Sequence, residues 1–290
     1  MKFGIVPINV GPYAEPQAML AMARHAEALG FESAWTFEHV IIPYAFESRY
    51  PYNKSGKPPG ASPDTKFIDP LIAIAHMAAA TTRLRFGTGV NILAQANPLF
   101  LAKQATSIDY LSGGRLMLGL GAGWLREEFD ALGVPFARRG KRTDDYLAAL
   151  RKAWAEGETV HQSEFIDWHG FHLSPRPVQQ PGIPLIVGGI TPAAIRRAVR
   201  YGDGWFLAHR DMAHLEELLA QLRAECKTQG RDPAALELTA FYSHERDGID
   251  GIARFKALGV ERLLVNIVAI RDPDVHGALA RIAKDIMPHA

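Results

Sequence analysis

The sequence has little cysteine, almost no excess charge and no long hydrophobic run. Its 290 residues include one cysteine, Cys226, which has no partner for an internal disulfide and therefore favours a reducing compartment. Lys and Arg number 32 against 31 Asp and Glu, so the chain lacks the positive charge typical of proteins that bind nucleic acids or anionic membranes. The most apolar stretch, 70–80, is too short to span a bilayer. Residues 1–7 are too few, and too soon interrupted by proline, for a signal peptide, so we expect a cytoplasmic protein.

The sequence also lacks the motifs of two common classes of hydrolase. It contains neither the G-x-S-x-G turn of nucleophilic serine enzymes nor the H-E-x-x-H helix of zinc proteases. His161, His169 and His172 share one short segment, but no carboxylate or cysteine stands at ligand spacing from them. We therefore expect no metal site, no acyl transfer and no metal-dependent hydrolysis.

What the sequence does have is a regular alternation of short apolar and longer amphipathic runs. The apolar runs are typical of buried parallel strands and lie at 2–8, 33–37, 84–90, 116–120, 184–187, 204–207, 236–241 and 262–267. The amphipathic runs predict helices at 16–29, 98–111, 143–156, 192–201, 212–229, 248–258 and 273–287. Eight such units predict an α/β fold, a TIM (β/α)8 barrel. A doubly wound sheet is the alternative, but it would carry a sharper nucleotide-binding fingerprint.

No linker rich in serine or glycine divides the chain, so we expect residues 1–290 to form a single domain. Two connections are longer than a barrel needs. The segment 40–66 follows the second strand, and we expect it to be a loop that covers the barrel mouth. The segment 160–184 contains an alternating stretch at 165–172 that predicts a short hairpin.

Residues that follow the strands are the candidates for function, because active sites of these barrels lie at the carboxyl ends of the strands. Glu38 and His39 follow the second strand and are the candidate catalytic residues. Histidine is the side chain best suited to accept or give a proton near neutral pH. The competing interpretation is a surface pair without a chemical role.

Two glycine-rich segments follow later strands. Gly121, Ala122, Gly123 and Trp124 come after the fourth strand, and glycines there would let a ligand approach the backbone or would simply form a tight turn. Gly188, Gly189, Ile190 and Thr191 come after the fifth strand and open a helix. Thr191 is a suitable N-cap, and backbone N–H groups at such a helix start bind phosphate. A capped helix that holds only water is the alternative.

Several stretches together resemble the bacterial luciferase-like monooxygenase superfamily, and within it the class that uses the deazaflavin coenzyme F-420. The resemblance covers residues 1–207. The stretches that carry it are AEALGFESAW at 26–35 followed by EH at 38–39, FGTGV at 86–90 with NP at 97–98 and AKQA at 102–105, LSGGR at 111–115 continuing to GW at 123–124 and EEF at 127–129, and VGG at 187–189 with GDGW at 202–205.

The resemblance implies a luciferase-like barrel with a deazaflavin or FMN in its mouth, and usually a homodimer. It places Glu38 and His39 beside the cofactor ring, with His39 as proton donor or acceptor, and the cofactor phosphate on the backbone of 188–191. It also implies a cis peptide bond between Gly89 and Val90, which would support the ring. Trp124 stands where sugar-phosphate dehydrogenases of the class have an acid, which argues against a sugar-phosphate substrate.

The function expected from these observations is hydride transfer between coenzyme F-420 and a small organic substrate. An FMN-dependent luciferase-like monooxygenase is the alternative among enzymes. A non-catalytic carrier of a flavin or deazaflavin is the alternative outside them. The aromatic residues in 40–66 suggest an aromatic or apolar substrate.

Overall fold

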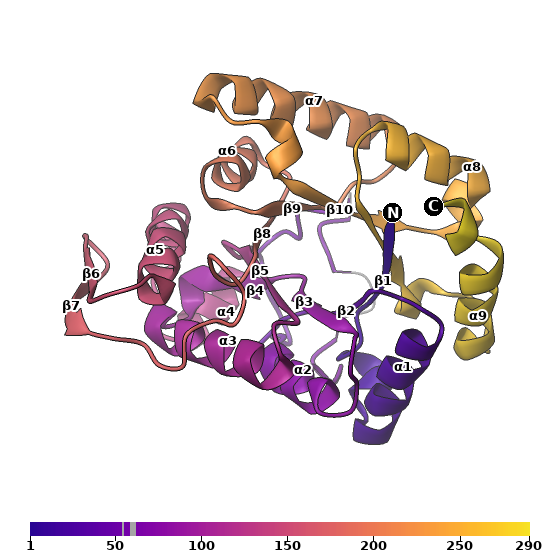
Figure 1. Cartoon of the computed structure of the whole chain (residues 1–290), viewed down its shortest axis with the longest axis horizontal. Helices are drawn as coiled ribbons and strands as arrows, with labels where there is room; N and C mark the ends of the chain where they lie inside the picture. The colour runs from indigo at the N-terminus through magenta and orange to yellow at the C-terminus, as the bar shows by residue number, and fades with distance from the viewer. Residues whose placement is uncertain (54, 59–61) are drawn as a thin grey trace.

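Eight parallel strands close into a barrel in the computed structural model, which describes residues 1–53, 55–58 and 62–290 (Figure 1). Neighbouring strands follow the order β3-β2-β1-β11-β10-β9-β8-β5, and β3 also pairs with β5, which closes the ring. The predicted TIM barrel is therefore confirmed. The strands are β1 (Lys2–Val6), β2 (Ser33–Thr36), β3 (Arg85–Thr88), β5 (Leu116–Gly121), β8 (Leu185–Gly188), β9 (Gly204–Leu207), β10 (Glu237–Tyr242) and β11 (Arg262–Asn266).

The third predicted strand is shorter than expected. It ends at Thr88, and the chain continues through Gly89 and Val90 into the two-residue strand β4 (Asn91–Ile92), which pairs with the end of β5. The peptide bond between Gly89 and Val90 is cis, as predicted. The chain thus makes an irregular step at the carboxyl end of the barrel.

Helices surround the barrel and follow its strands in the chain (Figure 1). All seven predicted helices are present. The structure starts two of them four residues earlier: α5 begins at Arg139, and α8 continues across a kink at Gly248, where the prediction began. The α-helices are α1 (Pro16–Ala28), α2 (Pro70–Ala78), α3 (Pro98–Ser112), α4 (Arg126–Ala131), α5 (Arg139–Trp154), α6 (Pro192–Tyr201), α7 (Met212–Gln229), α8 (His244–Ala257) and α9 (Val275–Asp285). The 3-10 turns are η1 (Gly11–Ala14), η2 (Leu93–Gln95), η3 (Pro233–Ala235), η4 (Ile267–Ala269) and η5 (Met287–His289).

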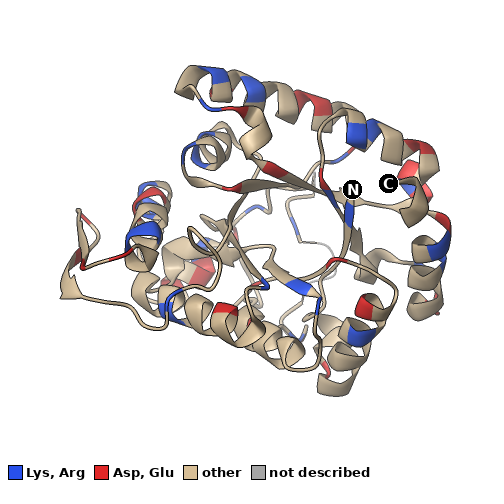
Figure 2. Ribbon diagram, in the orientation of Figure 1, with Lys and Arg blue, Asp and Glu red and all other residues tan. Residues whose placement is uncertain are grey.

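Acidic and basic residues are interspersed over these outer helices (Figure 2), in keeping with the nearly balanced charge. No helix within the described ranges is long and apolar enough to cross a membrane.

The two predicted insertions differ in structure. The segment 40–66 contains no helix or strand among its described residues; 54 and 59–61 lie outside them. The second insertion contains the predicted hairpin, formed by the antiparallel strands β6 (Thr159–Gln162) and β7 (Asp167–Phe171). It projects beside α5, to which the His161 Nε2 to Asp145 Oδ1 contact of 2.8 Å attaches it (Figure 1).

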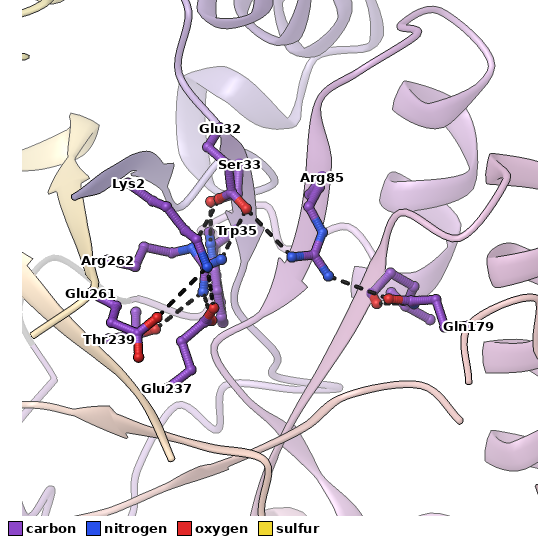
Figure 3. Close-up of polar contacts among 11 residues, drawn as sticks. Lys2, Glu32, Ser33, Trp35, Arg85, Gln179, Glu237, Thr239, Glu261 and Arg262 are labelled. Atoms are coloured by element: carbon purple, nitrogen blue, oxygen red, sulfur yellow. Dashed lines mark hydrogen bonds and ion pairs between the residues drawn. The ribbon is translucent and has the colours of Figure 1, made fainter. Parts of the chain in front are cut away.

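Inside the barrel, the amino-terminal ends of the strands are filled by charged side chains (Figure 3). Arg262 of β11 is fully buried and donates from Nε and Nη2 to the two carboxylate oxygens of Glu32, both at 2.9 Å. It also donates to Glu237, the first residue of β10, and to Thr239 Oγ1 at 3.4 Å. Its guanidinium lies 5.7 Å from the Trp35 ring. A single side chain therefore joins three strands across the barrel interior.

The charges in this network balance one another. Burial alone would raise the pKa of Glu32, but the hydrogen bonds and charge of Arg262 outweigh it and hold that pKa below its usual value. Burial likewise opposes ionisation of Glu237, and Arg262 together with Lys2 lowers the pKa of that carboxyl. Arg85 extends the network to Glu32 and to Gln179 on the other side (Figure 3). Charged side chains thus occupy the amino-terminal end of the barrel, so we expect a ligand at the opposite, carboxyl end.

We predict that Arg262→Met destabilises the protein strongly, because it leaves the half-buried carboxylates of Glu32 and Glu237 without their main partner. Breaking a buried ion pair from one side costs about 3–5 kcal/mol. The matched control is Arg281→Met, which removes an exposed ion pair with Asp272 and should cost under about 1 kcal/mol. Urea unfolding followed by circular dichroism compares the two. Equal midpoints for the two variants would contradict this role of Arg262.

Candidate active site

The chain that leaves β2 is fixed at the carboxyl end of the barrel by Asn9. This fully buried side chain accepts a hydrogen bond from Phe37 N at 2.9 Å and donates to Phe37 O at 2.8 Å. It also donates to Ile68 O at 2.6 Å, which joins the start of α2 to the same point. Glu38 and His39 therefore leave the barrel along a defined path. The sequence analysis missed Asn9, since a single polar residue after β1 carries no distinguishing signal.

The carboxyl group of Glu38 is directed toward β4. It accepts hydrogen bonds from Asn91 Nδ2 at 2.8 Å and from Ile92 N. Burial raises the pKa of Glu38 to about 7, with smaller contributions from the charges of Glu128 and Asp69, although the bonds from Ile92 and Asn91 act in the opposite direction. Glu38 thus fixes the segment that follows the cis bond, and near neutral pH it is partly protonated.

His39 has a different carboxylate as its partner. Its Nδ1 lies 3.3 Å from Glu128 Oε2, and the Glu128 side chain is only 2% exposed. The imidazole stands perpendicular to the rings of Phe67 and Trp124, with centroids 5.5 Å and 5.8 Å away. Although Glu38 and His39 are adjacent in the sequence, their side chains therefore contact different partners. Glu128 was not among the predicted site residues, although the EEF stretch at 127–129 was noted.

Aromatic residues of the loop 40–66 gather around Trp124. The Phe46 and Tyr50 rings meet Trp124 edge to face at 5.8 Å and 5.3 Å, and Tyr52 meets Tyr50 at 5.2 Å. Burial raises the pKa of Tyr50 to about 12, so this phenol stays neutral at physiological pH. The loop therefore adds an apolar wall to the barrel mouth, as its sequence predicts.

Two glutamates at the start of α4 hold this loop. Glu128 Oε1 accepts from Val40 N at 2.6 Å and from Ile41 N at 3.3 Å. Glu127 Oε1 accepts from Glu47 N at 2.7 Å and from Ser48 N at 3.1 Å. The first half of the loop is thereby attached to α4 at two points.

The glycines that follow β5 and end β8 pack against protein atoms. A Cβ added to Gly121 or Gly188 would lie 2.6 Å from a methyl group of Val90, so the Val90 side chain occupies the space between these two strands. Gly123 has a φ of +81°, and a Cβ there would lie 2.6 Å from Phe129. Ala122, between these glycines, is half-buried. Close internal packing is thus one reason for the glycines at which we expected a ligand to approach.

The loop between β8 and α6 differs from these glycines because it has free hydrogen-bond donors. Gly189 has a φ of +112°, a conformation that favours glycine, and its carbonyl accepts from Trp205 Nε1 at 2.8 Å. Thr191 Oγ1 accepts from Ala194 N at 3.2 Å, which confirms the predicted N-cap. Among the described residues, nothing accepts from the backbone N–H groups of Gly189, Ile190 and Thr191. Such groups at a helix start suit an anion.

This loop and the aromatic wall are neighbours. A Cβ on Gly189 would lie 3.9 Å from the Tyr52 hydroxyl. The described residues therefore bring together His39, Trp124, the loop 40–66 and the β8–α6 turn around one mouth. Within the same residues, no group of three or more His, Cys, Asp or Glu side chains is placed to hold a metal ion.

We predict that Gly188→Ala destabilises the protein by about 1–3 kcal/mol, because the added methyl group overlaps Val90. Adding Val90→Ala makes room for it, so the double variant should be more stable than the sum of the two single effects by about 0.5–3 kcal/mol. Gly140→Ala is the control, since a Cβ there would lie 3.5 Å from Arg197 Nη2, an ordinary contact distance. Thermal unfolding of the four variants gives the comparison, and strictly additive effects of Gly188→Ala and Val90→Ala would refute the overlap.

Comparison with known proteins assigns the family. The model of the luciferase-like monooxygenase family matches residues 1–244. The uncharacterized protein Rv0940c of Mycobacterium tuberculosis is 35% identical over 251 residues, which are 85% of this chain and 83% of that protein. The FMNH2-dependent dimethylsulfone monooxygenase of Pseudomonas putida is 26% identical over 70% of this chain and 54% of its own length. The coenzyme F420-dependent tetrahydromethanopterin reductase of Methanopyrus kandleri has the same fold, with a TM-score of 0.78 over 99% of both chains at 16% identity. This chain belongs to the luciferase-like monooxygenase family.

Proposed function

We propose that the protein is an oxidoreductase that transfers a hydride between coenzyme F-420 and a small organic substrate. The observation that carries the proposal is the arrangement of the mouth: His39, oriented by Glu128, shares it with a turn of free backbone N–H groups at the start of α6. One group suits proton transfer and the other suits a phosphate. An FMN-dependent monooxygenase is the second candidate, and a non-catalytic carrier the third.

The residues of the mouth fit a phosphate-bearing deazaflavin or flavin. The N–H groups of Gly189, Ile190 and Thr191 would hold the phosphate, next to Gly188. Gly89, Val90, His39, Ala122 and Trp124 would line the space for the ring. A bound deazaflavin supplies the hydride carrier.

His39 would accept or give the proton that accompanies hydride transfer, through its Nε2 atom. Its Nδ1 atom is occupied by Glu128. We propose a supporting role for Glu38 where a catalytic one was expected, because its carboxyl group is hydrogen-bonded to Asn91 and Ile92. Its contribution would be to hold the segment 89–92 against the cofactor ring.

One consideration favours coenzyme F-420 over FMN: the motifs of the chain most resemble the F-420 class. The aromatic wall of Phe46, Tyr50 and Trp124 favours an apolar or aromatic substrate. The fixed position of His39 argues against a carrier without catalytic function.

We predict that the purified protein binds coenzyme F-420 with micromolar or better affinity and FMN much more weakly, as followed by absorbance and fluorescence titration. The reverse preference would replace this proposal with the FMN-dependent monooxygenase. Binding of neither cofactor would contradict both.

We also predict that His39→Ala slows hydride transfer by about 100- to 10,000-fold in single-turnover stopped-flow measurements, with cofactor binding retained. The reason is the loss of general acid–base assistance. A variant that binds the cofactor and transfers hydride at the wild-type rate would show that His39 has another role.

We further propose a homodimer located in the cytoplasm. Large apolar side chains are exposed on two neighbouring helices: Ile72 on α2 is 65% exposed, and Phe100 and Leu111 on α3 are 72% and 80% exposed. Covering such residues is a common function of a subunit interface. Light scattering should give about twice the chain mass of 31.9 kDa. Phe100→Asp with Leu111→Asp should give monomers, whereas the control Ile249→Asp on α8 should not; a monomeric wild type would refute the dimer.

A further inference from the structure

Glu128 is a buried carboxylate whose two oxygens have different partners. Oε1 accepts from the backbone N–H groups of Val40 and Ile41. Oε2 faces His39 Nδ1 at 3.3 Å. Because Oε1 accepts two backbone N–H bonds, it carries no proton itself. An ionised carboxylate only accepts hydrogen bonds, so the proton between it and His39 must be carried by Nδ1.

The remaining contacts of His39 fix the orientation of its imidazole ring. The rings of Phe67 and Trp124 contact the imidazole edge to face, and the His39 side chain is 12% exposed. Nε2 has no hydrogen-bond partner among the residues that the structure describes. With the proton on Nδ1, a neutral His39 presents the lone pair of Nε2 to the mouth.

The neighbouring carboxylates of Glu38 and Glu127 have other partners, so neither replaces Glu128 beside His39 Nδ1. Glu38 is hydrogen-bonded to Asn91 and Ile92. Glu127 resembles Glu128 in holding the loop, through Glu47 N and Ser48 N, but within the described residues no hydrogen bond or ion pair joins it to His39. The chain therefore offers a matched pair of adjacent glutamates, both attached to the loop and only one attached to the histidine.

We propose that Glu128 is a positioning residue that sets the tautomer of His39, with the proton on Nδ1 and Nε2 free to take a proton at the barrel mouth. When Nε2 takes up a proton, the resulting imidazolium lies against the Glu128 carboxylate, which stabilises it. Only the use of Nε2 in catalysis rests on the proposed function. The tautomer is a property of the protein without a ligand.

Nitrogen-15 NMR of the ligand-free protein tests the tautomer directly. The protein is labelled at its histidine rings, the His39 signals are identified by their loss in His39→Gln, and spectra are taken at pH 8.5, well above the usual histidine pKa of about 6.5. We expect the wild type to show the proton on Nδ1. Glu128→Gln should move it to Nε2, because the glutamine oxygen is needed by Val40 and Ile41 and its NH2 group then donates to Nδ1.

The control variants separate this effect from a general disturbance of the loop. Glu127→Gln alters the other attachment of the loop and should leave the proton on Nδ1, whereas Glu128→Asp keeps a carboxylate and should restore the wild-type tautomer at least in part. A wild type with the proton on Nε2, or a Glu128→Gln protein that keeps it on Nδ1, would overturn the inference.

The catalytic consequence is measured separately. If His39 acts as proposed, Glu128→Gln slows hydride transfer by about 100- to 10,000-fold, and Glu128→Asp recovers part of the rate. If Glu128→Gln changes the tautomer of His39 without any change in rate, Glu128 does set the tautomer, and the acid–base role of His39 is refuted. The two claims thus fail independently.

Discussion

The buried guanidinium of Arg262 is the constraint on which the rest of the architecture depends. A charge inside a barrel is tolerated only when it is fully paired, and here Glu32, just before β2, and Glu237, at the start of β10, supply the pairing. Because the network occupies the amino-terminal end of the barrel, we expect a ligand to bind at the carboxyl end. That end holds His39, the Gly89–Val90 step and the β8–α6 turn. The position of the mouth therefore follows from how the opposite end is closed.

Much of the fold could be predicted because buried parallel strands appear in the sequence as continuous apolar runs. All eight barrel strands start within one residue of the predicted positions, and the alternation at 165–172 located β7, one of the two strands of the hairpin. Arg262 was not predicted, because one arginine at the start of an apolar strand looks like an exposed strand end. Its partner Glu32 is 230 residues away in the chain, and only closure of the barrel brings the two together.

The site was predicted in outline for a similar reason. Glu38 and His39 follow a strand, and in a parallel barrel such positions lie at the mouth. The sequence could not show that these neighbours separate: Glu38 contacts β4, while the histidine pairs with Glu128, 89 residues later. Nor could the sequence distinguish a glycine that makes room for a ligand from one that makes room for the Val90 side chain. Both positions require a residue without a side chain. Such distinctions depend on which elements meet, and that is a property of the folded chain.

We propose that the mouth holds the redox cofactor between His39 and the start of α6. The most direct measurement is a crystal structure of the protein with coenzyme F-420 bound. We expect the deazaflavin ring beside His39 and Val90, with the phosphate on the N–H groups of Gly189, Ile190 and Thr191. A cofactor whose phosphate lies instead beside the loops that follow β10 and β11, with no contact to His39, would contradict it.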